Sequence, residues 1–338
     1  MWLLFLGLTG IAGLARADEG QARAEQVGSE LIGTAAPAFK LTSIDGQIID
    51  LSSLYGKKAV YLKFWATWCV PCLQQMPHFE HAFETQGSDL AVIAINTNFN
   101  ETPESVVAYR QRHGLKMPIV MDDGRLAAAL NLRVTQQHVL IARDGRVAFV
   151  GHLADEKLDL ALAAVRQPKS HAPSLKAARA VNASRPGAVR TTAGEEFILR
   201  DPEGQRETVL VFMSPWCEGY LKDSRPAMSA QCREVREQTE KLALHSRSHW
   251  IDIASGLWAD GADLKEYQQK NGLHIPAALD ASGNLFRSYA VTSVPTVVVL
   301  SPQGQELRRA SGGADEVGAL LAAESHQGEI REGTAQKP

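Results

Sequence analysis

Residues 59–72 read Ala-Val-Tyr-Leu-Lys-Phe-Trp-Ala-Thr-Trp-Cys-Val-Pro-Cys, and this stretch decides the fold. An apolar run of strand length ends at Trp65, and two cysteines three positions apart follow where the chain can become helical. The free N–H groups and the dipole at a helix N-terminus favour the thiolate of the first cysteine. The spacing therefore predicts a redox pair in which Cys69 is the nucleophile and Cys72 is the resolving thiol.

Two other interpretations of this pair stay open. A zinc site would need a second pair of ligands at suitable spacing, and the remaining cysteines, Cys217 and Cys232, lie far downstream. The other interpretation is an inert structural bridge, which needs no further ligands. His78 and His81 share a helix face and could bind a metal, but they are more typical of a solvated helix face. We therefore expect no metal and no cofactor other than the redox-active disulfide.

The residues around the cysteine pair resemble the thioredoxin superfamily, and in particular the extracytoplasmic thiol-disulfide oxidoreductases of the TlpA and ResA type. This resemblance rests on residues 64–72 with Met76-Pro77, on residues 32–39 and 45–47 upstream, and on residues 140–146 downstream. It implies a central mixed sheet flanked by helices, with Trp68 and Pro71 as active-site neighbours at the start of a helix. It also implies protein thiols and disulfides as substrates, and a membrane electron donor of the DsbD or CcdA kind.

The first residues, 1–17, have the pattern of a secretory signal peptide. Their apolar run continues to Leu14, and Ala15-Arg16-Ala17 fits an A-x-A cleavage signal. The run is short for a membrane span and no Lys or Arg precedes it, so an uncleaved anchor stays open. Export agrees with a cysteine pair that cycles through a disulfide. The family resemblance implies a periplasmic location.

Length, charge and hydrophobicity bound the class of protein. The 338 residues are comfortable for two domains of ordinary size. A net charge of −3 without a basic cluster argues against a nucleic-acid partner. A hydrophobic fraction of 45% is ample for ordinary cores.

A weak internal repeat indicates that one domain is duplicated. Residues 113–118, His-Gly-Leu-Lys-Met-Pro, parallel residues 271–276, Asn-Gly-Leu-His-Ile-Pro, and residues 209–217 parallel the strand that leads into the first cysteine pair. We therefore expect an α/β protein with tandem thioredoxin-like folds, each a central mixed sheet flanked by helices. The expected boundaries are a signal peptide over 1–17, a first domain over 30–166, a linker over 167–186, a second domain over 187–324 and a disordered tail over 325–338.

Two positions would tune the first site. Lys63 lies six residues before Cys69, where cytosolic thioredoxins have a buried aspartate that helps to move protons. A lysine would favour the Cys69 thiolate if its head reached the site, or it could point into a polar pocket without effect. Gln75 lies three residues after Cys72, where ResA-like proteins carry a glutamate that tunes the cysteines. Glutamine does not titrate, so we expect that tuning to be absent.

Thioredoxin-like proteins place a cis-proline opposite the cysteine pair, and the first half has Gln136 at this place. The second half keeps the proline, as Pro295. A cis bond before another residue costs about 3 kcal/mol, so we expect the bond before Gln136 to be trans. Its amide near Cys69 would alter substrate docking or open the site to a metal, unless the change is tolerated drift or an introduced substitution.

The second half has the reverse defect, because Trp216 and Cys217 are followed by Tyr220 in place of a resolving cysteine. Cys232 is the other candidate partner. In one continuous helix over 217–243 the two cysteines would be about 22 Å apart, whereas a bridge needs Cα atoms within about 7 Å. Pro226 could break the helix and let the chain fold back.

Four states of the Cys217 sulfur therefore stay open. The first is a bridge to Cys232, and the second is a free thiol that forms mixed disulfides. The third is a copper site completed by Met213, Met228 or histidines, since thiolates and thioethers suit Cu(I). The fourth is inert burial. The six methionines do not cluster, which is poor support for a copper carrier.

The leading functional hypothesis is a periplasmic thiol-disulfide oxidoreductase, acting as a reductant, whose second domain docks substrates or regulates the first. The alternative is a non-catalytic protein that binds copper or docks a partner during assembly of a metalloenzyme or cytochrome. A peroxidase of the peroxiredoxin type is disfavoured, because the second half lacks a Thr-x-x-Cys signature.

Overall fold

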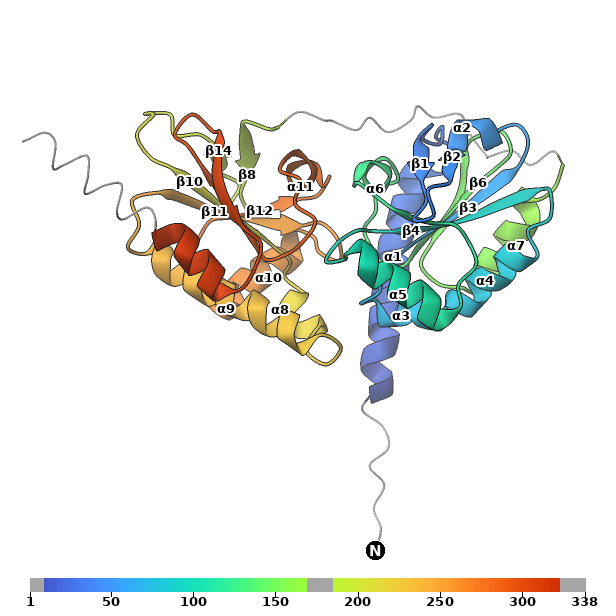
Figure 1. The fold of residues 1–338 in the computed structure, drawn as a ribbon, viewed down its shortest axis with the longest axis horizontal. Helices are drawn as coiled ribbons and strands as arrows, with labels where there is room; N and C mark the ends of the chain where they lie inside the picture. Colours follow the sequence, from blue (N-terminus) through green and yellow to red (C-terminus); the bar gives the residue numbers. More distant parts are fainter. Residues whose placement is uncertain (1–8, 169–184, 323–338) are drawn as a thin grey trace, which may run out of the picture. The chain divides into compact units, whose positions relative to one another are not determined.

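The computed structural model describes residues 9–168 and 185–322, with side chains described from residue 19 onward. The chain divides into two compact units, Met1–Asn182 and Ala183–Pro338, each with its own sheet and helices (Figure 1). The expected signal peptide, linker and tail fall wholly or partly outside the described residues, so these three assignments stay predictions.

The sheet of the first unit has five strands in the order β5-β4-β3-β6-β7. Its middle strand, β3 (Ala59–Trp65), runs parallel to β4 (Leu90–Asn96) and antiparallel to β6 (Gln137–Ile141). The edge strands are β5 (Ile119–Met121) and β7 (Val147–Gly151). Every residue of β3 is buried, as expected for a strand that is covered on both faces. The cysteine pair therefore follows directly after the central strand.

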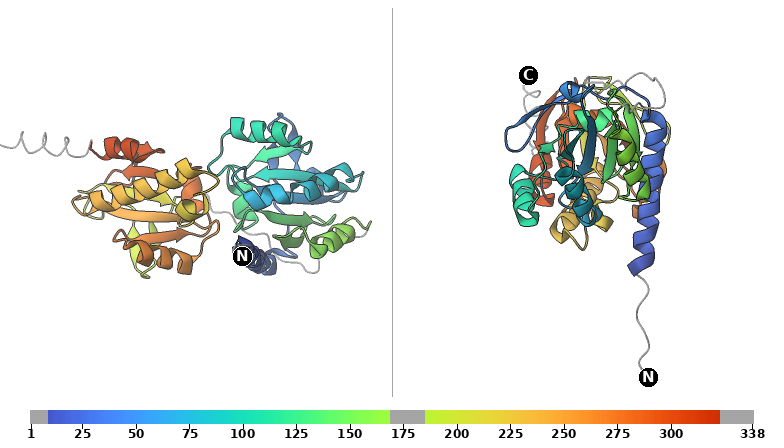
Figure 2. Two further views of the ribbon diagram at one scale, coloured as in Figure 1. Left: turned by 90° about the horizontal axis from the view of Figure 1, so that it is seen from below. Right: turned by 90° about the vertical axis from the view of Figure 1, so that its right-hand side faces the viewer.

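Helices lie on both sides of this sheet (Figure 2). Helix α3 (Val70–Gln74) begins within the cysteine pair, and α4 (Met76–Glu84) continues after a break at Gln75. Pro77 lacks the N–H group that a continuous helix would need at this place. The remaining elements of the unit, apart from α1, are β1 (Lys40–Thr42), β2 (Ile48–Asp50), α2 (Leu51–Leu54), α5 (Pro103–His113), α6 (Arg125–Ala129) and α7 (Glu156–Val165).

Helix α1 (Thr9–Leu31) packs on the first unit, although the expected domain boundary leaves most of it out. The side chains of Val27 and Leu31 are buried, and the helix lies against β7. The side chain of Gln21 accepts a 3.0 Å hydrogen bond from the backbone N–H of His152. The sequence carried a signal for this helix, because its buried apolar residues recur at helical spacing. In the described part of the chain, no helix has both the length and the apolar character needed to cross a membrane.

The second unit has the same sheet, in the order β12-β11-β10-β13-β14. Its middle strand, β10 (Thr208–Met213), runs parallel to β11 (His249–Ser255) and antiparallel to β13 (Thr296–Leu300). The same order and direction of all five strands confirm the expected tandem thioredoxin-like folds. The remaining elements outside the α8 region are β8 (Ala188–Arg190), β9 (Glu196–Ile198), β12 (Ala277–Asp280), β14 (Glu306–Ala310), α10 (Gly261–Asn271), α11 (Asn284–Ser288) and a helical segment over 314–322.

The continuous helix considered over 217–243 is broken into two parts. Helix α8 (Cys217–Tyr220) ends after one turn, and α9 (Pro226–Ala243) starts at the proline, which is tolerated only in the first turn of a helix. The hydroxyl of Ser229 donates a 2.6 Å hydrogen bond to the carbonyl of Glu218, which ties α9 to α8. The chain thus folds back after Cys217.

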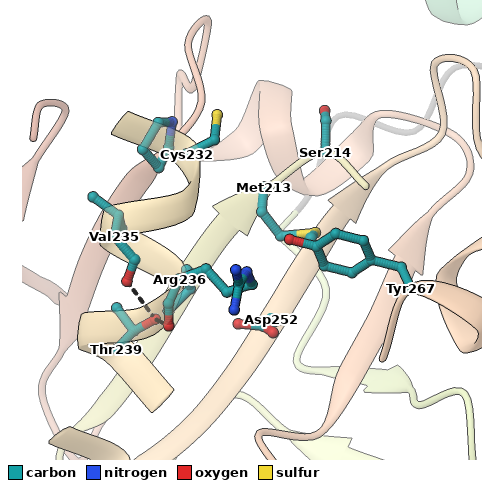
Figure 3. Close-up of a pocket in the computed structure, with 10 residues that line it drawn as sticks. Met213, Ser214, Cys232, Val235, Arg236, Thr239, Asp252 and Tyr267 are labelled. Atoms are coloured by element: carbon teal, nitrogen blue, oxygen red, sulfur yellow. Dashed lines mark hydrogen bonds between the residues drawn. The ribbon is translucent and has the colours of Figure 1, made fainter. Parts of the chain in front are cut away.

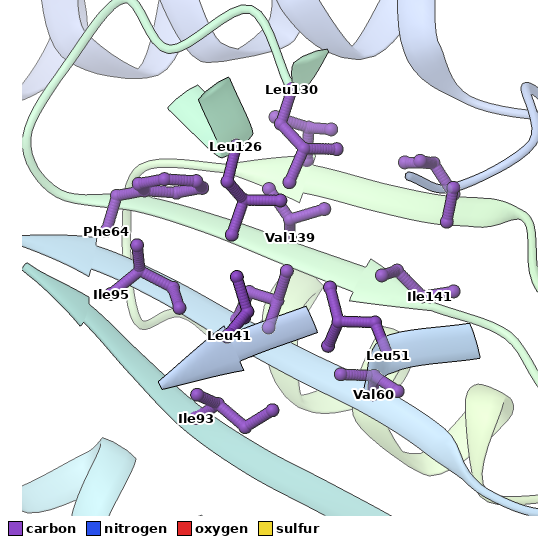
Figure 4. Close-up of a cluster of buried hydrophobic side chains, with 14 of the residues drawn as sticks. Leu41, Leu51, Val60, Phe64, Ile93, Ile95, Leu126, Leu130, Val139 and Ile141 are labelled. Carbon is purple, nitrogen blue, oxygen red and sulfur yellow. The ribbon is translucent and has the colours of Figure 1, made fainter. Parts of the chain in front are cut away.

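The two faces of β3 have different surroundings. Val60, Leu62 and Phe64 pack in an apolar cluster with residues of β4, β6 and α6 (Figure 4). The alternate residues, Tyr61 and Lys63, are equally buried but point to the opposite face, toward α4. The face that carries the cysteine helix therefore holds polar groups, while the other face is apolar.

Candidate active site

The first cysteine pair is held at the start of α3 as a disulfide with a Cα–Cα distance of 5.2 Å. Cys69 is the N-cap residue of α3, and its Sγ accepts a hydrogen bond from the backbone N–H of Cys72 at 3.2 Å. Pro71 lies in the first turn, where its missing N–H costs nothing. Cys69 is 2% exposed and Cys72 is fully buried. Both cysteines are thus buried in the oxidised chain, and their roles as nucleophile and resolving thiol stay predictions.

The loop before Cys69 is fixed by two sets of hydrogen bonds. The indole Nε1 of Trp68 donates a 2.7 Å hydrogen bond to the carbonyl of Phe99. The hydroxyl of Thr67 donates a 2.8 Å hydrogen bond to the carboxylate of Glu101, and the backbone N–H of Thr67 donates to the same carboxylate. Since Phe99 and Glu101 follow β4, the loop after β4 positions the segment that leads into Cys69.

Lys63 is fully buried, and its Nζ has no hydrogen-bond partner among the described residues. The Nζ atom lies 5.6 Å from the ring centroid of Phe79, on α4. Burial lowers the pKa of this lysine from 10.5 to about 7. The lysine head is directed at α4, a buried histidine lies opposite Lys63 in the sheet, and the effect of Lys63 on the Cys69 thiolate stays a prediction.

That histidine is His138, which is fully buried and pairs with Lys63 in the register of β3 and β6. The backbone N–H of Ala154 donates to Oε1 of Gln75 at 2.7 Å, which identifies this atom as the oxygen. His138 Nε2 lies 3.1 Å from the same oxygen and must be the donor, so its Nδ1 accepts the hydroxyl of Tyr61 at 2.8 Å. Burial keeps the pKa of His138 well below its usual value, which agrees with this neutral tautomer.

The expectation of a trans bond before Gln136 is wrong, because the peptide bond between Thr135 and Gln136 is cis. The second unit has its cis bond between Val294 and Pro295, at the matching place before β13. Gln136 is fully buried, and its carbonyl accepts a 2.7 Å hydrogen bond from Nδ1 of His152. The expectation of a trans bond considered only the preference of a single peptide bond and took no account of tertiary contacts of this kind. Both polar atoms of the Gln136 amide are buried without a partner among the described residues.

Three residues near the site were not found from the sequence: Tyr61, His138 and His152. The antiparallel pairing of the central strand with the hairpin could have placed His138 opposite Lys63, since the two segments were both expected as strands. His152 follows the hairpin directly and gave no comparable signal. Of the two histidines considered as metal ligands, His81 is exposed, whereas His78 is half-buried with its Nε2 2.7 Å from a carboxylate oxygen of Asp159.

The second unit repeats the geometry around its first cysteine. The backbone N–H of Cys217 donates to the carbonyl of Ser214 at 3.1 Å, as that of Cys69 donates to Ala66 at 3.2 Å. Nε1 of Trp216 donates to the carbonyl of Leu257 at 2.7 Å, which reproduces the anchoring of Trp68. Tyr220 packs edge-on against Trp216 with ring centroids 5.9 Å apart.

The partner of Cys217 is Cys232, on α9, with a Cα–Cα distance of 6.3 Å. Of the four states left open for Cys217, the structure therefore shows the bridge, and the break at Pro226 makes it possible. The two sulfurs are bonded to each other, so the free-thiol and copper alternatives do not apply to this oxidised chain. Within the described residues, no group of three or more His, Cys, Asp or Glu side chains could hold a metal ion.

Comparisons with known proteins point to one family. The AhpC/TSA family model matches residues 32–150. The chain is 32% identical over 132 residues to the thiol-disulfide oxidoreductase ResA of Bacillus thuringiensis (strain Al Hakam), covering 38% of this chain and 75% of that protein. It is 38% identical over 101 residues to the thioredoxin-like protein YneN of Bacillus subtilis, covering 30% and 59%.

Solved structures that align with the chain are also thioredoxin-like proteins. One is the exposed lipoprotein thioredoxin Etrx1 of Streptococcus pneumoniae, with 27% identity, a TM-score of 0.33 and coverage of 37% of this chain and 97% of that chain. Another is described as a putative thiol:disulfide interchange protein DsbE of Chlorobium tepidum, with 24% identity, a TM-score of 0.36 and coverage of 40% and 98%.

Proposed function

Because the chain belongs to the family of ResA-type thiol-disulfide oxidoreductases, we propose that its first unit reduces disulfides of exported proteins in the periplasm. The observation that carries the proposal is the state of the two sulfurs. Cys69 Sγ receives the N–H group of Cys72 at a helix start, while Cys72 is fully buried behind it. A backbone donor at this position favours a thiolate on Cys69.

The reaction is an exchange of two disulfides through one mixed disulfide. The Cys69 thiolate of the reduced chain attacks one sulfur of the substrate disulfide, and the other substrate sulfur leaves as a thiolate and takes up a proton. Cys72 then loses its proton and attacks Cys69, which releases the second substrate sulfur as a thiolate that also takes up a proton. The substrate gains two electrons and two protons, and the chain regains the Cys69–Cys72 bond.

The surface beside the pair favours a polypeptide substrate. Val70 is 51% exposed and Leu73 is 40% exposed, and both lie on α3 next to the cysteines. Two exposed apolar side chains beside the cysteines suit an extended substrate segment of low charge. The electrons would come from a membrane donor of the DsbD or CcdA kind, in keeping with the family and with an exported chain.

The experiment is a redox titration of the full chain in glutathione and dithiothreitol buffers, with free thiols counted by mass after alkylation. We expect a Cys69–Cys72 couple with a potential below about −200 mV, as for a reductant. The variant Cys69→Ser should remove this couple, whereas Cys217→Ser should leave it. The proposal fails if the pair stays oxidised across the whole series, and a much higher potential would indicate an oxidase or isomerase.

A second variant tests the order of the two cysteines. Cys72→Ser should accumulate a mixed disulfide between Cys69 and a peptide disulfide, because no resolving thiol remains. Cys69→Ser should accumulate little, since Cys72 is not at the N-cap position, where the sulfur accepts a backbone N–H group. The opposite result would reverse the assignment of nucleophile and resolving thiol.

A further inference from the structure

We propose that the bridge between Cys217 and Cys232 is a second redox centre, which accepts two electrons from a dithiol protein. This inference goes beyond the proposed function, which concerns the first pair alone. It rests on three observations in the second unit: the preserved surroundings of Cys217, the exposure of Cys232, and a cavity that joins Cys232 to a buried carboxyl group.

The surroundings of Cys217 match those of the nucleophile in the first unit more closely than a structural bridge requires. The tryptophan before the cysteine donates to a loop carbonyl at 2.7 Å in both units. The backbone N–H of the cysteine donates to the carbonyl three residues earlier in both units, at 3.2 Å for Cys69 and 3.1 Å for Cys217. Only the resolving cysteine has moved, from the first helix to α9. The second unit therefore has the local geometry of a thiol-exchange site, and its first cysteine is bonded to a cysteine of another helix.

The two sulfurs of the bridge differ in their access to solvent. Cys217 is 1% exposed, whereas Cys232 is half-buried and borders a small cavity. Pro295, the residue before β13, borders the same cavity. Because Cys232 is the more exposed of the two residues, an incoming thiolate would reach Cys232 first.

The cavity also holds a carboxyl group, that of Asp252 on β11. The side chains of Cys232, Arg236 and Asp252 border it together (Figure 3). Its volume is about 20 Å³, room for a single water molecule. Asp252 pairs with Val211 in the sheet, and Val211 lies six residues before Cys217, as Lys63 lies six residues before Cys69.

Other charged and titratable groups face Asp252 from the two helices packed on it. Arg236 and Glu240 come from α9, and Tyr267 comes from α10. Arg236 is engaged by Glu218, at 2.8 Å, and the Tyr267 hydroxyl donates to the same carboxylate at 2.5 Å. Burial raises the pKa of Asp252 well above its usual value, which favours the protonated carboxyl group.

The reaction balances with one dithiol protein as the reductant. Its first thiolate attacks Cys232, the bridge breaks, and Cys217 leaves as a thiolate and takes up a proton. Its second thiolate attacks its first sulfur and releases the Cys232 thiolate into the cavity. Asp252 supplies the proton for this thiolate and is reprotonated from solvent. The donor is oxidised to a disulfide, and the chain gains two electrons and two protons.

The test uses the full chain with Cys69→Ser and Cys72→Ser, so that only the second bridge reports. Two donors are supplied under native conditions: a bacterial thioredoxin kept reduced by its reductase, and the reduced first pair in a full chain with Cys217→Ser and Cys232→Ser. Thiols are counted by mass after acid quench and alkylation, and near-UV circular dichroism follows the fold. We expect both thiols to appear with at least one donor while the spectrum stays native. A bridge that opens only in urea, or with loss of the native spectrum, is structural and overturns the proposal.

The thioredoxin donor separates this result from the proposed function, because it does not depend on the first pair. Asp252→Asn should slow the reduction by at least roughly tenfold near neutral pH and flatten its dependence on pH. The matched control is Asp280→Asn, another buried aspartate, which lies on β12 and does not border the cavity. Equal rates in the two variants would remove Asp252 from the proposal, and slow reduction with an altered fold in both would do the same.

Discussion

Replacing Lys63 with methionine should stabilise the first unit at neutral pH, although it removes a charged group next to the active-site helix. The lysine is fully buried, and its Nζ has no hydrogen-bond partner among the described residues. Burial lowers its pKa from 10.5 to about 7. At about 1.4 kcal/mol per pKa unit, this gap corresponds to an upper limit of about 5 kcal/mol for charging the buried lysine.

The sign of the pH dependence follows from proton binding. Between pH 7 and 10.5 the unfolded chain binds more protons at this lysine than the folded chain does, so stability rises with pH in this window. The free energy of unfolding of the wild type should gain about 2 kcal/mol from this group between about pH 7 and 9. Because methionine does not titrate, the advantage of Lys63→Met should fall from about 4 kcal/mol at about pH 7 to about 2 kcal/mol at about pH 9.

The assay is pulse proteolysis in urea on the oxidised protein, with peptides from β3 quantified so that the first unit is followed by itself. Oxidised protein is used because disulfide-bonded cysteines do not titrate. The control is Lys57→Met, an exposed position where the change should stay below about 0.5 kcal/mol. The reasoning is refuted if Lys63→Met is less stable than the wild type at neutral pH, or if its advantage does not shrink as the pH rises.

Four further substitutions test the described contacts and the burial of one carboxyl group. Gln75→Glu puts a carboxylate against Nε2 of His138, which should raise the pKa of His138 and appear in an NMR titration of the imidazole. Trp68→Phe and Trp216→Phe each remove a 2.7 Å hydrogen bond from the indole and should each lower the free energy of unfolding of their own unit by about 1–2 kcal/mol in urea titrations. Burial raises the pKa of Asp122 to about 6. The protonated carboxyl group therefore stabilises the first unit at low pH, and the free energy of unfolding should fall by up to about 3 kcal/mol as the pH rises through 6. Asp122→Asn should abolish this loss in the same urea titrations.

Each of these predictions has a control or a contrary result. Gln74→Glu, at an exposed neighbouring position, should leave the titration of His138 unchanged. A tryptophan substitution that leaves both units at wild-type stability would show that the indole hydrogen bond does not position the loop. A pH profile that is identical in wild type and Asp122→Asn would assign the loss of stability to other groups.

Much of the fold could be predicted from the sequence because its signals are local. Apolar runs of strand length, the spacing of Cys69 and Cys72, and the repeated Gly-Leu motif each depend on a few adjacent residues. They predicted the tandem architecture and the first redox pair. Helix α1 was missed although its apolar spacing is visible, because the same segment begins like a signal peptide.

The surroundings of the site could not be predicted in the same way, because they join residues far apart in the chain. The cis bond before Gln136 goes against the preference of a non-proline residue, and contacts such as the hydrogen bond from His152 surround it. The chain from Tyr61 through His138 to Gln75 requires the pairing of β3 with β6 and the return of the chain after β7.

The sequence by itself determined that Cys69 and Cys72 lie three positions apart at the start of a helix, because this spacing is a local property. It left open whether Cys217 has a partner, because about 22 Å of continuous helix would separate it from Cys232. The tertiary structure decided that question, by breaking the helix at Pro226 and packing α9 against α8. Contacts between distant segments select one local geometry among several that the residues allow, and only the folded chain contains those contacts.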